Sequence, residues 1–141
     1  MGKTLTTLIK LEEKRVEDIQ LHLADNRRAQ DRTQDAIARW NIDAAAAFAD
    51  GLADGDVRGM QAAGAFQHRA QTAMLALERD LTHLRDQAAA LLEKLQAAYA
   101  AQKRFEILAE QQARAEAKAK AQKNQANLDE IGSRRPPKNT T

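Results

Sequence analysis

The strongest constraint on this chain is one uninterrupted stretch, from about residue 60 to residue 131. It contains no proline, and past Gly64 it contains no glycine either. Because an α-helix rises about 1.5 Å per residue, the stretch can form one helix roughly 100 Å long. Its apolar residues recur three and four apart, which predicts a narrow coiled-coil seam with one helical partner. The seam runs through Met74, Leu77, Leu81, Leu84, Ala88, Leu91, Leu95, Ala98, Gln102, Phe105 and Ala109.

The last part of this stretch continues the helix without the seam. After Ala109 the same positions hold Gln112, Glu116, Ala119 and Lys123, yet strong helix formers continue for about twenty more residues. We therefore expect a long helix that is packed over its first half and unpaired over its second half.

A second seam with the same spacing runs through the first third of the chain. It is apolar at both ends and polar in the middle. A polar seam weakens packing while it fixes register, so this midsection is either the loosest part of the pairing or a place where polar residues are merely tolerated. The positions are Leu5, Ile9, Glu12, Val16, Ile19, Leu23, Asn26, Gln30, Thr33, Ile37, Trp40, Ala44 and Ala47.

Three glycines separate the two seams. Gly51, Gly55 and Gly59 each weaken a helix, and Asp54 or Asp56 can cap a new one. This predicts a turn at about 49–60 between helices at about 4–48 and 61–131. The expected fold is all-α, a long antiparallel two-helix coiled-coil hairpin over residues 1–135, with the second helix overhanging at the terminal end. Residues 132–141 are expected to form a disordered tail.

The position of the turn also predicts which residues face each other. In a hairpin folded here, the numbers of facing residues add to roughly 110. Trp40 is then expected near Ala70 and Leu5 near Phe105. Val16 and Ile19 are expected near Leu91 and Leu95.

Composition agrees with long helices and excludes several functional classes. Of 141 residues, 43% are apolar but only 4% are aromatic, and 30% are charged, so one domain without a sheet is expected. The net charge is only +2, and both signs alternate along the chain, which predicts a solvated surface and no nucleic-acid partner. No apolar run approaches the ~20 residues that cross a bilayer, and no signal peptide is evident, so a cytoplasmic protein is expected.

The residues that usually carry chemistry are sparse. There is no cysteine, Ser133 is the only serine, and the three histidines, His22, His68 and His83, lack the close helical spacing of a metal site. We expect a protein that is not an enzyme, with no cofactor, no metal and no small-molecule substrate.

Three segments resemble the family of the flagellar type III export protein FliJ and its injectisome relatives. Residues 5–18 have the spaced leucines followed by acidic and basic residues, and Phe66-Gln67 opens the long helix of a hairpin. Residues 125–131, Gln-Ala-Asn-Leu-Asp-Glu-Ile, resemble the closing Gln-Lys-Lys-x-Asp-Glu signature. Ala126 and Asn127 replace its basic pair. The resemblance spans nearly the whole chain.

The resemblance implies a non-enzymatic, stalk-like adaptor similar to the central stalk of rotary ATPases. Its terminal end would insert into the hexameric flagellar export ATPase and stimulate it. Its other end would contact the export gate at the inner membrane, and it would help to hand over export chaperones and substrates. The equivalent injectisome protein and a purely structural cytoplasmic coiled coil are the alternatives.

Two surfaces are predicted to carry these contacts. An unpaired helix of ~20 residues is only marginally stable in water, so the overhang favours a socket in a partner over a frayed end. The ATPase-binding residues are predicted to be Leu8, Leu11, Val16, Arg114, Lys118, Lys120, Gln125, Leu128, Asp129 and Glu130. The gate-binding residues are predicted to be Phe66, Ala70, Ala73 and Leu77, unless Phe66 instead closes the end of the hairpin.

Overall fold

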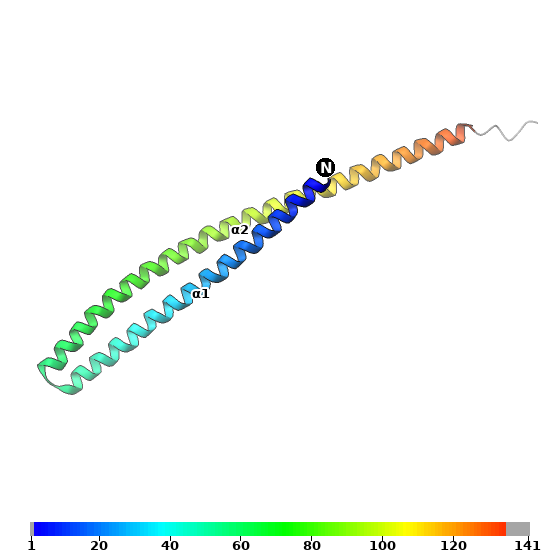
Figure 1. The fold of residues 1–141 in the computed structure, drawn as a ribbon. Helices are drawn as coiled ribbons and strands as arrows, with labels where there is room; N and C mark the ends of the chain where they lie inside the picture. Colours follow the sequence, from blue (N-terminus) through cyan, green and yellow to red (C-terminus); the bar gives the residue numbers. More distant parts are fainter. Residues whose placement is uncertain (1, 135–141) are drawn as a thin grey trace, which may run out of the picture. The chain divides into compact units, whose positions relative to one another are not determined.

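The computed structural model describes residues 2–134, which form two long helices that pack against each other (Figure 1). Helix α1 spans Gly2–Asp54 and has 53 residues, and helix α2 spans Val57–Arg134 and has 78 residues. No strand occurs in this described part of the chain. The predicted all-α hairpin with a longer second helix is confirmed.

Both helices extend further than expected. Helix α1 continues past residue 48 to Asp54, and the turn shrinks from the expected 49–60 to two residues. Gly51 and Gly59, which were expected in the turn, lie inside α1 and α2. Helix α2 continues through Gly132 to Arg134. The remaining residues of the expected tail, 135–141, lie outside the described part of the chain.

The turn itself consists of Gly55 and Asp56. Gly55 has a φ of 65°, a left-handed conformation that glycine adopts without a steric penalty just after a helix. The Asp56 carboxylate accepts a hydrogen bond from the backbone N–H of Gly59 at 2.7 Å, and the Asp56 carbonyl accepts one from the N–H of Met60 at 3.2 Å. Asp56, rather than Asp54, is therefore the N-cap of α2.

The contacts divide the described chain into two compact units. The first comprises residues 16–97 and contains the turn. Its buried apolar side chains lie on the facing sides of α1 and α2, and Ala70 is the only one with no exposed surface. A two-helix seam covers its larger residues only partly. The buried apolar residues of this unit are Val16, Ile19, Ala44, Ala63, Ala70 and Leu81.

Two hydrogen bonds between the helices define the register of this unit. The Asn26 side-chain amide donates to the Leu84 carbonyl at 2.9 Å, and the Gln67 amide donates to the Ala44 carbonyl at 2.6 Å. The residue numbers of these pairs add to 110 and 111, in agreement with the predicted register. The Trp40 ring reaches Phe66, one helical turn closer to the turn than its expected neighbour.

The second unit comprises residues 2–15 of α1 together with residues 98–134 of α2. Leu5, Leu8 and Ile9 are half-buried on α1, and Ala98 is buried on α2. Phe105 is half-buried as well, and its pairing with Leu5 stays a prediction. Packing fades along α2: Gln112 is the last residue that is not exposed.

Candidate partner-binding surfaces

The most exposed part of the described chain is the end of α2. Every residue from 113 to 134 is exposed, and we call this stretch the terminal helix segment. At about 1.5 Å per residue, it is roughly 33 Å of helix that packs on nothing in its own unit. It carries five basic and three acidic side chains, namely Arg114, Lys118, Lys120, Lys123 and Arg134, with Glu116, Asp129 and Glu130.

Most of the carboxylates and both arginines of this region are already paired along the helix. Arg114 donates to Glu110 at 2.5 Å, and Arg134 donates to Glu130 at 2.6 Å. The Gln125 amide donates to Asp129 at 3.1 Å. Such exposed i,i+4 pairs support the helix by only ~0.3–0.5 kcal/mol each.

The lysines of the terminal helix segment are not paired in this way. Within residues 2–134, no carboxylate forms an ion pair with Lys118, Lys120 or Lys123. Each ammonium group therefore retains three donors for an acceptor outside the chain. Of the predicted charged contacts, Lys118 and Lys120 form no ion pair in the described chain, whereas Arg114 already pairs with Glu110.

The apolar residues predicted for the same surface are not equivalent. Leu11 is more than half exposed, Leu8 is half-buried, and Val16 is buried in the unit of residues 16–97. Val16 is therefore a packing residue and offers little surface. In the terminal helix segment, Leu128 is exposed together with Ile131, the last residue of the predicted second helix. Their i,i+3 spacing was the signal that they share one face.

The four predicted gate-binding residues face the helix–helix contact. Phe66 is half-buried. Its ring centroid lies 5.8 Å from that of Trp40 on α1, and the guanidinium carbon of Arg69 lies 5.6 Å from the Phe66 ring centroid. Ala70 is 0% exposed, so it sets the distance between the helices and cannot touch a partner while the hairpin is intact. Ala73 and Leu77 are half-buried and keep part of their surface exposed.

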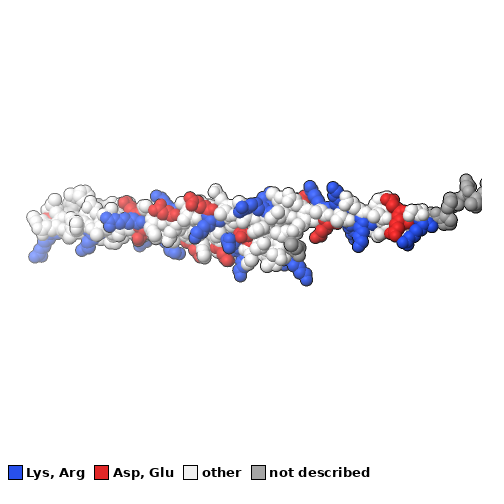
Figure 2. Space-filling model, turned by 90° about the horizontal axis from the view of Figure 1, so that it is seen from above, with Lys and Arg blue, Asp and Glu red and all other residues white. Residues whose placement is uncertain are grey.

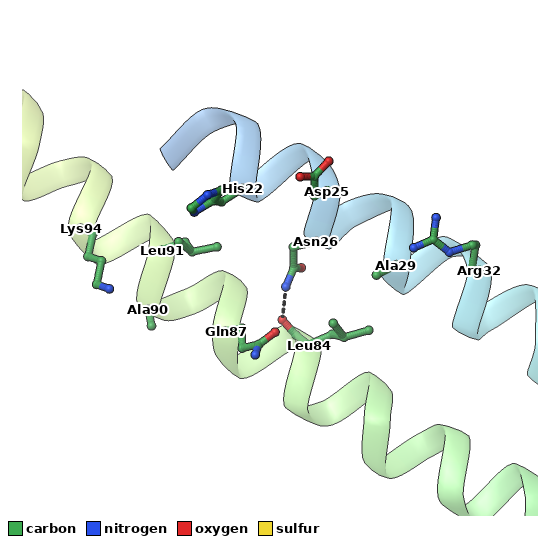
Figure 3. Close-up of a pocket in the computed structure, with 10 residues that line it drawn as sticks. All are labelled: His22, Asp25, Asn26, Ala29, Arg32, Leu84, Gln87, Ala90, Leu91 and Lys94. Carbon is green, nitrogen blue, oxygen red and sulfur yellow. Dashed lines mark hydrogen bonds between the residues drawn. The ribbon is translucent and has the colours of Figure 1, made fainter. Parts of the chain in front are cut away.

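The polar midsection contains an open hollow rather than a tight seam (Figure 3). Asn26 reaches across from α1 to the Leu84 carbonyl, and its own side-chain oxygen accepts a hydrogen bond from Gln30 at 2.6 Å. Thr33 donates back to the Ala29 carbonyl of its own helix at 2.8 Å. The polar side chains are therefore satisfied, but the space is not filled. The hollow has a volume of about 580 Å³ and is lined by His22, Asp25, Asn26, Ala29, Arg32, Leu84, Gln87, Ala90, Leu91 and Lys94.

The surface near the turn differs from the rest of the hairpin. Figure 2 shows acidic and basic residues interspersed over most of the visible face, whereas uncharged residues dominate at the turn, at the left. Large apolar side chains are exposed here, and we call Phe48, Leu52, Val57 and Met60 the turn-end apolar patch. Sequence reasoning missed it because it assigned most of these residues to the turn. The i,i+4 spacing of Phe48 and Leu52 was the available signal.

Two further findings concern metal-binding groups and membrane-spanning stretches among the described residues. Across residues 2–134, no group of three His, Asp or Glu side chains is arranged to hold a metal ion. Neither described helix has a stretch apolar enough to cross a membrane.

Comparison with known proteins supplies the context for these surfaces. The chain matches the family model described as flagellar FliJ protein over residues 1–140. No curated protein and no solved structure gives a significant match. Because the family model covers almost the whole chain, and the two-helix fold agrees with the expectation drawn from the resemblance, this chain belongs to the flagellar FliJ protein family.

Proposed function

We propose that this protein acts as a stalk-like adaptor in flagellar type III export. In this proposal the terminal helix segment enters the central opening of the hexameric export ATPase and stimulates ATP hydrolysis. The other end of the hairpin contacts the export gate, and the protein assists the hand-over of export chaperones and substrates. Family membership supports a role in flagellar export, and these specific contacts are the proposal.

The observation that carries the proposal is that every residue from 113 to 134 is exposed. A helix that buries no apolar surface gains little to offset the conformational entropy lost on ordering. A partner that surrounds the helix would supply that free energy. The three unpaired lysines, Lys118, Lys120 and Lys123, would then meet acceptor groups around a pore without locking the helix to one subunit.

Deletion of residues 113–141 tests this role directly. The truncated chain is expected to keep the melting curve of the intact protein, because every described residue in the deleted stretch, 113–134, is exposed. It is expected to lose stimulation of ATP hydrolysis by the purified hexameric ATPase in steady-state assays. Equal stimulation by the truncated and intact chains would contradict the stalk mechanism and favour a structural coiled coil.

Charge reversal tests whether stimulation of ATP hydrolysis needs the lysine charges or only the presence of the helix. Replacement of Lys118, Lys120 and Lys123 by glutamate should weaken stimulation. The defect should depend on salt concentration, because exposed charges are screened over about 10 Å at 0.1 M ionic strength. The matched control reverses three exposed arginines of the other unit, Arg27, Arg39 and Arg79. Equal defects in both triple variants would mean that only net charge matters.

The gate contact is tested at Phe66. Replacement of Phe66 by alanine removes its contact with Trp40, so some loss of stability is expected whatever its function. Replacement of Trp40 by alanine removes the same ring contact from the other helix and is the control. If Phe66 touches the gate, only Phe66→Ala should weaken binding to detergent-solubilised gate protein beyond the effect of destabilisation. Equal binding by the two variants would assign Phe66 to packing alone.

A further inference from the structure

The turn-end apolar patch surrounds a small hollow that the proposed function does not use. The hollow has a volume of about 140 Å³ and lies between α1 and α2 close to the turn. Three of its walls are the exposed side chains of Phe48, Leu52 and Met60. Phe66, the centre of the predicted gate surface, is not among the lining residues, which are Phe48, Gly51, Leu52, Met60, Ala63, Gly64 and Gln67.

Small residues form the floor of the hollow. Gly51 lies so close to α2 that a Cβ added to it would be 2.7 Å from the Ala63 Cβ and 2.9 Å from the Gly59 carbonyl oxygen. This close approach brings the two helices together beneath the patch. Gly64 is different, because an added Cβ would meet nothing within 4 Å. The hollow is therefore open beside Gly64, and a larger residue at this position would narrow it.

Acidic residues outnumber basic ones around the patch: residues 48–60 contain Asp50, Asp54 and Asp56, and Arg58 is the one basic residue among them. No Lys, Arg, Asp or Glu lines the hollow. At the turn, a Cβ built on Gly59 would lie 3.3 Å from an Asp54 carboxylate oxygen and 3.1 Å from one of Asp56, so both carboxylates flank the first turn of α2 beside Met60. Within residues 2–134 neither aspartate forms an ion pair with a basic side chain.

We propose that the turn-end apolar patch receives an amphipathic helix of a protein partner. Apolar side chains of that helix enter the hollow between Phe48, Leu52 and Met60, and a basic residue at one end of the helix meets Asp54 and Asp56. This is the helix-in-groove mode, in which apolar anchors recur at helical spacing. The inference is independent of the ATPase and gate contacts proposed above.

Other occupants fit the same surface less well. A stable interface between two copies uses about 20–30 residues on each side, whereas the patch offers four large apolar side chains. Two copies joined here would also bring like charges together at Asp54 and Asp56. An anionic lipid surface would repel the same carboxylates. A basic amphipathic helix satisfies both the apolar hollow and the charge beside it.

The test uses the full-length chain with ¹³C-methyl-labelled methionine and two designed peptides. Each peptide has leucines at i, i+3, i+4 and i+7 on one face, and its last turn carries three lysines in one peptide and three glutamates in the other. The lysine peptide should shift the methyl signal of exposed Met60 and leave that of half-buried Met74 unchanged. Fluorescence anisotropy should show affinity for the lysine peptide about tenfold higher than for the glutamate peptide.

Matched variants assign the binding to the patch. Leu52→Gln should weaken the lysine peptide about tenfold, the scale of an apolar anchor, whereas Leu21→Gln, at a similarly exposed leucine of the same helix, should not. The double variant Asp54→Asn, Asp56→Asn should remove the preference for lysine while keeping the cap, because Asn caps as well as Asp. Thermal melts check that each variant is folded.

Several results would overturn the proposal. One is equal binding of both peptides to all variants. Another is a Met60 shift that follows protein concentration and self-association in sedimentation, which would identify a second copy as the occupant. A third is binding to vesicles containing phosphatidylserine that Leu52→Gln abolishes, with no response to either peptide.

Discussion

The turn end of residues 16–97 and the terminal helix segment are both highly exposed, but only the first is held by the chain itself. At the turn, Gly55 adopts a left-handed conformation, Asp56 caps α2, and Gly51 packs against Ala63. In residues 113–134 the bonds that the structure records are i,i+3 and i,i+4 contacts along one helix. Exposure alone therefore does not define a binding surface. The turn is shaped by contacts between α1 and α2, whereas the side-chain contacts of the terminal helix segment stay within one helix.

The largest expected effect compares two leucines. Leu81 is 8% exposed in the seam, so Leu81→Ala should destabilise the hairpin by about 2–3 kcal/mol, at the lower end of the range for core leucines because a two-helix seam encloses side chains only partly. Leu128, which is exposed, should tolerate alanine with no change in the main thermal transition. Circular dichroism melts measure both. If Leu128→Ala also lowered the transition, the terminal segment would contribute to folding and the comparison would fail.

The next effect uses one substitution, glycine to alanine, in three environments. At Gly51 the added methyl meets Ala63 and the Gly59 backbone, so a net loss of about 1–2 kcal/mol is expected even after alanine's better helix propensity is counted. At Gly64 there is space, and a gain of about 0.5–1 kcal/mol is expected. At Gly132 only local helicity should rise, because that residue is exposed in the terminal segment.

Denaturant unfolding followed by circular dichroism would rank these three variants. A stabilised Gly51→Ala variant would show that the close approach of the helices near the turn can relax. That outcome would also weaken the inference that the hollow beside Gly51 is preformed.

These glycines show where the sequence was a sufficient guide and where it was not. The three–four spacing predicted the seam, and the position of the turn predicted the register that the Asn26–Leu84 bond displays. The helix ends were misplaced because Gly51 and Gly59 were treated as helix breakers. Their intrinsic preference is worth about 1 kcal/mol each, and tertiary packing overrides it.

The candidate surfaces were only partly predictable for a related reason. The exposure of residues 113–134 follows from the missing seam, since a helix without an apolar stripe has nothing to bury. The full burial of Ala70 and the contact between Trp40 and Phe66 depend on side-chain directions that spacing alone does not specify. The exposed turn-end patch was missed because it exists only when α1 extends to Asp54 and α2 begins at Val57.

A smaller effect concerns the cap at the turn. Asp56→Ala removes the acceptor for the Gly59 N–H and should cost about 1 kcal/mol, whereas Asp56→Asn should cost little. Asp129→Ala removes only the exposed contact with Gln125 and should leave the melting temperature unchanged. Thermal melts of the three variants at equal concentration test this order. Equal losses at Asp56 and Asp129 would indicate that the turn is no more structured by its own contacts than the terminal segment.

The smallest expected effect compares an isoleucine substitution where two helices face each other with one in the terminal helix segment, where no helix lies opposite. Thr33 lies in the polar midsection, is half-buried, and by the register of Asn26 with Leu84 faces Leu77. Thr33→Ile adds apolar surface opposite a helix, so a gain of about 0.5–1 kcal/mol is expected from partial burial. Ala119→Ile adds more apolar surface at a corresponding seam position of the terminal segment, but no helix faces it there. Only the weaker helix propensity of isoleucine should therefore affect the free energy of unfolding. Denaturant midpoints should therefore rise for Thr33→Ile and not for Ala119→Ile.

Addition of the hexameric ATPase would not change the first result. A rise in both midpoints for the free protein would mean that the terminal segment already packs against something in its own chain, and its exposure would then no longer support insertion into a partner.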